Sequence, residues 1–85
     1  MQSFNYTITD EAGIHARPAG MLVKEAGKYN AQVMVKHGEK EADARKLFAL
    51  MQLGIKKGDE VQVTVTGDDE DAVVVQMEQF FNENI

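Results

Sequence analysis

The chain has 85 residues, a formal net charge of −5, one proline and no cysteine. This length predicts one domain spanning residues 1–85, which is stable by a modest margin and has room only for a shallow site. The lack of cysteine excludes disulfides, thiolate metal sites and thiol nucleophiles, and no apolar run is long enough to insert into a membrane. The first residues, MQSFNYTITDE, show no signal peptide, so we expect a cytoplasmic protein.

The charged residues are unevenly distributed along the chain. Residues 1–16 carry two acids, residues 17–57 hold all nine Lys and Arg against four acids, and residues 58–85 hold eight acids and no base. The overall negative charge argues against nucleic-acid binding, whereas a basic middle segment can dock an acidic protein partner. The alternative is that the fold scatters these charges over a solvated surface.

The first half of the chain predicts a strand, a helix and a second strand. Apolar and polar residues alternate over residues 4–8 and again over residues 31–36, as in half-buried strands. Between them, apolar residues recur at helical spacing, and proline is favoured in the first turn of a helix. We therefore expect a helix that begins at Ala16 to Pro18 and ends near Lys28. The residues expected off its core face are Gly20, Met21 and Lys24.

The second half predicts the remaining elements. A turn leads into a short strand at residues 40–42, and residues 46–53 are expected to form a short helix. Valines alternate with polar residues over residues 61–66 as in a strand, and the acids at 68–71 open a last helix. The order β-α-β-β-α-β-α predicts an α+β domain with helices on one face of an antiparallel sheet.

The short helix at residues 46–53 carries more apolar residues than one core-facing side can hold. Two helical turns cannot point all of them into one core, so we expect some to be exposed. These residues are Leu47, Phe48, Leu50, Met51 and Leu53.

His15 lies at the start of the first expected helix, two residues before Arg17. The free N–H groups and the dipole of a helix N-terminus favour the binding of an anion. The planar guanidinium group of arginine matches the geometry of a phosphate group. A neutral imidazole nitrogen is a nucleophile near neutral pH. These residues predict a histidine that accepts a phosphoryl group. The alternative is an ordinary histidine at a helix start, with Arg17 merely solvated.

Other kinds of catalytic site find little support in the sequence. The single serine is Ser3, the acids at 68–71 are explained by a helix start, and His37, beside a glycine in a turn, is expected to be a surface residue. Two distant histidines without cysteine lack the spacing of metal ligands, and no glycine-rich phosphate loop occurs. We therefore expect no metal and no cofactor.

Four segments together resemble the HPr family, the phosphocarriers of the bacterial phosphoenolpyruvate:sugar phosphotransferase system. They are GIHARPA at residues 13–19, KYNA at 28–31, LFALMQLGIKKGDEV at 47–61, and the V-x-V-x-V strand that enters G-D-D-E. The resemblance covers essentially the whole chain, in the family's order. It implies an open-faced β-sandwich, in which a four-stranded antiparallel sheet is covered on one face by three helices.

The resemblance also implies a function. His15 would be phosphorylated on Nδ1 by phospho-Enzyme I and would pass the phosphoryl group to an enzyme IIA domain of a sugar permease. Ala16 and Arg17 would donate backbone N–H groups, Arg17 would add its guanidinium, and Pro18 would fix the helix start. Such a protein is a monomeric carrier with a phosphohistidine intermediate and not a stand-alone enzyme.

A docking surface beside His15 would meet both partners transiently. Its expected residues are Gly20, Lys24, Arg45, Lys46, Leu47, Phe48 and Met51. Two alternatives stay open: a carrier for a nitrogen-related or regulatory branch, and an interaction module that transfers nothing. The cognate enzyme IIA would identify the first, and the presence of His15 with Arg17 weighs against the second.

Three positions depart from the family pattern. Many Gram-positive members carry a kinase-phosphorylated serine where an ungapped count from His15 places Lys46, and no other hydroxyl residue is nearby, so we expect no control by that kinase. Ala12 stands where relatives often have Asn or Ser, so one side-chain contact at the site is expected to be missing. Gly20 is smaller than the usual residue and is expected to loosen the helix by up to about 1 kcal/mol.

Overall fold

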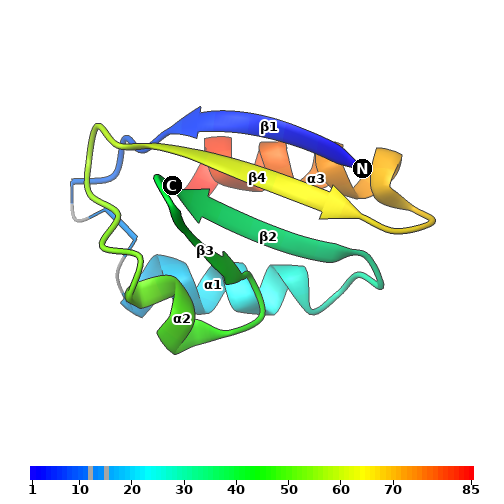
Figure 1. Ribbon diagram of the computed structural model, residues 1–85, viewed down its shortest axis with the longest axis horizontal. Helices are drawn as coiled ribbons and strands as arrows, with labels where there is room; N and C mark the ends of the chain where they lie inside the picture. The colour runs from blue at the N-terminus through cyan, green and yellow to red at the C-terminus, as the bar shows by residue number, and fades with distance from the viewer. Residues whose placement is uncertain (12, 15) are drawn as a thin grey trace.

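The computed structural model describes residues 1–11, 13–14 and 16–85, which form four strands and three helices (Figure 1). In chain order they are β1 (Gln2–Thr7), α1 (Ala16–Ala26), β2 (Gln32–His37), β3 (Lys40–Asp43), α2 (Leu47–Met51), β4 (Glu60–Thr66) and α3 (Glu70–Asn84). This is the β-α-β-β-α-β-α order expected from the sequence, and the α+β class is confirmed.

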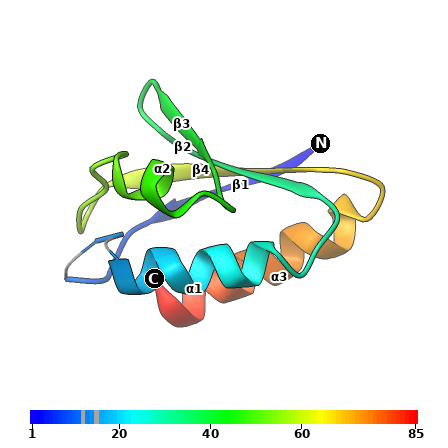
Figure 2. The same cartoon turned by 90° about the horizontal axis from the view of Figure 1, so that it is seen from below.

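The four strands form one antiparallel sheet in the order β1-β4-β2-β3. β4 is central, so Val63 pairs with Phe4 on one side and with Val35 on the other. Alternate residues of β4 are buried, which gives the sheet one apolar face. Figure 2 shows α1 and α3 beneath that face, while the opposite face is uncovered in the described part of the chain. α2 contacts α1 and β3.

Phe81 of α3 lies at the centre of the packing between that helix and the sheet. Its side chain is fully buried, and its ring makes edge-to-face contacts with Phe4 and Tyr6 of β1, with ring centroids 5.6 Å apart in each case. Such aromatic pairs stabilise the fold by more than the burial of their apolar surface alone. The edge strand β1 is therefore fixed both by its pairing with β4 and by an aromatic cluster beneath it.

Two helices are shorter than expected because their ends tighten into turns. α1 ends at Ala26 and not near Lys28, since the Lys28 N–H donates to the Glu25 carbonyl three residues back (3.1 Å). α2 begins after Lys46, whose backbone is extended, and ends before Leu53, whose N–H donates to the Leu50 carbonyl (3.2 Å). Bonds over three residues are typical of a helix end.

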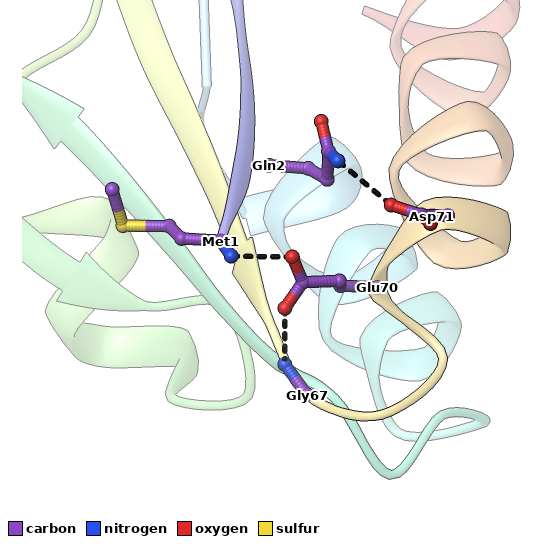
Figure 3. Close-up of polar contacts among 5 residues, drawn as sticks. All are labelled: Met1, Gln2, Gly67, Glu70 and Asp71. Carbon is purple, nitrogen blue, oxygen red and sulfur yellow. Dashed lines mark hydrogen bonds and ion pairs between the residues drawn. The ribbon is translucent and has the colours of Figure 1, made fainter.

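Two polar contacts tie the start of the chain to the first turn of α3, and a third joins that turn to Gly67, which follows β4 (Figure 3). The Met1 ammonium group forms an ion pair with Glu70, and the Gln2 side-chain amide donates to Asp71 Oδ1 (2.7 Å). Glu70 Oε1 accepts the N–H of Gly67 (3.1 Å). The hydrogen bond from the terminal ammonium group and the Gly67 N–H hold the pKa of Glu70 below its ordinary value.

Glu70→Gln is expected to destabilise the protein more at pH 7 than at pH 3. A carboxyl group whose folded pKa is lowered stabilises the fold above its unfolded value of 4.5, and this contribution is lost as the pH falls through the folded value. Urea unfolding at both pH values measures the difference, with Glu78→Gln on the exposed side of α3 as the control. An effect of equal size at pH 3 and pH 7 would contradict this account of Glu70.

Candidate functional site

The N-terminus of α1 begins at Ala16, directly after His15 in the sequence. His15, the expected catalytic residue, and Ala12 both lie outside the described residues. Arg17 is exposed in the first turn of α1, and Pro18 is buried there, where a missing N–H costs no helical hydrogen bond. Free backbone N–H groups and an exposed guanidinium are therefore available immediately after His15.

The segment before His15 is held against the loop that follows α2. The Ile14 N–H donates to the Ile55 carbonyl oxygen (3.2 Å), and Ile14 is buried. Gly13 has φ +67°, and a Cβ there would lie 2.3 Å from Ile55 O and 2.7 Å from Lys56 Cα. Only glycine accommodates both the conformation and the close approach. No local sequence pattern indicates this contact, because Ile55 lies far from Gly13 along the chain.

A hollow of about 420 Å³ lies beside Arg17, between the start of α1 and the end of α3. The N–H groups of Thr9 and Asp10 donate to the Ile85 carbonyl oxygen (3.3 and 2.9 Å), which joins the end of the chain to the loop before α1. Both acidic and basic side chains line the hollow. Its lining residues are Asp10, Arg17, Pro18, Met21, Glu83 and Asn84.

The apolar side chains of α2 and the turn after it divide between core and surface, as expected. Leu50 and Leu53 are buried, and Leu47 is half-buried against the core. Phe48 and Met51 remain 74% and 38% exposed. Residues three apart on a helix lie on neighbouring positions of its surface, so Phe48 and Met51 together expose apolar area on α2 and are the strongest candidates for a docking contact.

The polar residues expected at the docking surface lie in different settings. Lys24 lines a groove of about 460 Å³ between α1 and α3. A Cβ on Gly20 would meet open space. Lys46 is exposed immediately before α2. The structure thus brings Lys46, Phe48 and Met51 onto one short segment, whereas Lys24 lies toward α3.

Arg45 has a structural task that sequence reasoning missed. Its guanidinium Nη2 donates to the carbonyl oxygens of Tyr29 (2.6 Å) and Ala31 (3.1 Å), and its backbone N–H donates to Asp43 Oδ1 (2.8 Å). It therefore ties the connection before α2 to the connection after α1. No local pattern indicates this, because the partners lie 14 and 16 residues away.

The clearest pKa shifts in α1 and the turn after it lie at the far end from His15. The Tyr29 hydroxyl donates to Glu25 Oε2 (2.7 Å), and Lys28 lies 3.0 Å from Oε1. The Tyr29 hydrogen bond, supported by Lys28, lowers the pKa of Glu25, while burial and the Glu25 carboxylate raise the pKa of Tyr29 to about 12. This group stabilises the turn after α1 and is separate from the candidate site.

Neither a metal site nor a membrane span is found in the part of the chain that the structure describes. No three His, Asp or Glu side chains there are placed to hold a metal ion. Likewise, none of the helices there is both long and apolar enough to cross a membrane.

Comparison with known proteins gives consistent matches over nearly the whole chain. The family model described as the HPr component phosphorylation site of the phosphotransferase system (PTS) matches residues 2–83. The phosphocarrier protein HPr of Mycoplasma capricolum is 34% identical over 79 residues, or 93% of this chain and 89% of that protein. A solved mycoplasma histidine-containing phosphocarrier protein is similar with a TM-score of 0.91 at 32% identity, covering 96% of this chain and 93% of that one.

A further similar structure is the catabolite repression protein Crh of Bacillus subtilis, which is an intertwined, domain-swapped dimer. It is 26% identical, has a TM-score of 0.77, and is matched over 94% of this chain and 92% of its own. The fold, the full-length family match and the identity to a phosphocarrier lead to one conclusion. The chain belongs to the HPr family of phosphocarriers of the phosphotransferase system.

Proposed function

We propose that the chain accepts a phosphoryl group on His15 from phospho-Enzyme I and passes it to enzyme IIA domains for sugar uptake. The observation that carries the proposal is the start of α1 at Ala16, with an exposed Arg17 in its first turn. A phosphoryl group on the residue directly before a helix N-terminus gains both the helix dipole and an arginine fork.

In the proposed reaction, the lone pair of His15 Nδ1 attacks phosphorus while the bond between phosphorus and the donor protein breaks. One bond to phosphorus forms as another is lost, so no oxidant, cofactor or water is consumed. The chain's contribution is to position the group and to stabilise its charge. The N–H groups of Ala16 and Arg17 and the Arg17 guanidinium would face the phosphoryl oxygens, while Pro18 would fix the helix start.

The direct test is incubation with phosphoenolpyruvate and Enzyme I, followed by mass spectrometry of the phosphorylated chain. One acid-labile, base-stable phosphoryl group is expected on His15, and His15→Ala should carry none. The matched control is His37→Gln, which removes the other histidine and should reach full labelling at completion. No label on the wild-type chain, or a label that survives in His15→Ala, would refute the proposed function.

Phe48→Ala is expected to raise the KM for phospho-Enzyme I about tenfold, as for an aromatic residue at the centre of an interface. Because Phe48 is 74% exposed, its removal should change the free energy of unfolding by less than about 0.5 kcal/mol. Steady-state transfer and urea unfolding measure both effects. The control is Val75→Ala, which removes a 60% exposed apolar side chain from α3. Equal KM values in the two variants would exclude Phe48 from the docking surface.

We further propose that the chain works as a monomeric, single-domain protein of the cytoplasm. A carrier must present the same helix end first to a donor and then to an acceptor. A monomer leaves Arg17, Phe48 and Met51 open to both, as their exposure allows. The swapped dimer of Crh shows that a related chain can take another assembly.

A further inference from the structure

His37 was expected to be a surface residue; in the structure it is partly buried and makes two polar contacts with a distant loop. It is the last residue of β2 and continues the inward-facing row of Val33 and Val35. Its side chain is only 27% exposed. The imidazole Nδ1 lies 2.9 Å from the Leu53 carbonyl oxygen, and Nε2 lies 3.2 Å from Asp59 Oδ2.

These two partners lie in the connection between α2 and β4, residues 52–59, and bound the part of it that we call loop 53–59. Within that loop, Asp59 Oδ2 also accepts the Lys56 N–H (2.9 Å), and the Asp59 N–H donates to the Lys56 carbonyl oxygen (3.0 Å). The Asp59 carboxylate therefore closes the turn at residues 56–59. His37 spans the loop by contacting both of its ends.

The middle of the same loop supports the segment before His15. Between the two partners of His37 lies Ile55, whose carbonyl oxygen accepts the Ile14 N–H (3.2 Å). The backbone of Gly13 also lies against Ile55 and Lys56, with no room for a Cβ. A continuous set of contacts therefore runs from His37 through the loop to Ile14.

Both contacts of His37 are with acceptor atoms. Nδ1 lies at hydrogen-bond distance from the Leu53 carbonyl oxygen, and Nε2 lies beside the Asp59 carboxylate, with which the ring forms an ion pair when it is protonated. Nearby charged residues include Lys40, directly opposite on β3, and Glu39 in the intervening turn.

We propose that His37 is a positioning residue for the reaction at His15, and the inference rests on the proposed phosphoryl transfer. His37 holds loop 53–59 against Gly13 and Ile14, which fixes the segment that immediately precedes His15. Loss of the His37 side chain removes both contacts and loosens that segment.

The experiment measures amide hydrogen exchange by NMR together with transfer kinetics. The protection factor of the Ile14 amide, which already corrects for intrinsic base catalysis, should fall about tenfold in His37→Gln, as expected when a hydrogen bond that holds the loop is lost. Asp59→Asn should behave in the same way. Lys40→Gln, which changes the residue opposite His37, should match the wild type.

Transfer kinetics separate positioning from binding. In His37→Gln, kcat should fall about tenfold, while the KM for phospho-Enzyme I stays within twofold, because Phe48 and Met51 lie on α2 outside the loop.

Two results would overturn the role of His37. One is Ile14 protection and kcat that match the wild type in His37→Gln. The other is a loss of protection that is equal at Ile14 and at Val63 in the centre of the sheet, which would mean that His37 only stabilises the whole fold. Absence of label on the wild-type chain would instead refute the proposed function, so the two failures are distinct.

Discussion

Replacing Arg17 with alanine should slow phosphoryl transfer through His15 by about 10²- to 10³-fold, as for the loss of one preorganised charged donor. Stability should hardly change, because the side chain is exposed. Rapid-quench transfer from phospho-Enzyme I and urea unfolding measure the two quantities. Arg17→Lys keeps the charge but loses the planar fork, so it should recover part of the rate.

Arg45→Ala provides the matched comparison, because the Arg45 guanidinium binds backbone carbonyl oxygens of the chain itself and is expected to stabilise the fold. Two backbone carbonyl oxygens, of Tyr29 and Ala31, would lose their charged donor, which predicts a loss of about 1–3 kcal/mol in stability. Any effect on transfer should be confined to KM. If Arg17→Ala transferred at the wild-type rate, the phosphoryl group would be held by other residues than those at the start of α1.

The contrast between the two arginines shows what the sequence could reveal. The proposed role of Arg17 can be inferred from the sequence because the pattern is local: it lies two residues after a histidine and directly before a proline at a helix start. Arg45 looked like another basic residue at a docking surface, because its partners lie 14 and 16 residues back in the chain. Local chemistry is visible in sequence, whereas a contact between distant segments depends on how the elements pack.

The same distinction holds for the elements themselves. The alternation of valines with polar residues was enough to predict β4, because both of its neighbours bury the same face. The limits of β1 were predicted less well, since the strand begins at Gln2, where pairing with Val65 starts, and not at Phe4. Likewise, His37 was taken for a turn residue because Leu53 and Asp59 cannot be placed beside it without the fold.

Gly13→Ala is expected to destabilise the protein by roughly 2–5 kcal/mol, combining the cost of a left-handed residue with the loss of a buried hydrogen bond. The added Cβ would meet Ile55 O at 2.3 Å and Lys56 Cα at 2.7 Å. Both are backbone atoms, which cannot rotate away as a flexible side chain can. Either the loop after α2 or the segment before α1 must move, and the hydrogen bond from Ile14 to Ile55 is then lost.

Gly38→Ala separates the contact at Gly13 from its conformation. Gly38 has nearly the same dihedral, φ +63° against +67°, but a Cβ there would have no atom within 4 Å. Gly38→Ala should therefore lower the free energy of unfolding only by the cost of a left-handed alanine, about 1–2 kcal/mol. Urea unfolding of both variants measures the difference. If both lost the same stability, the approach of Gly13 to Ile55 would contribute nothing. A larger loss in Gly13→Ala, together with slower labelling of His15, would show that this contact holds the reactive segment in place.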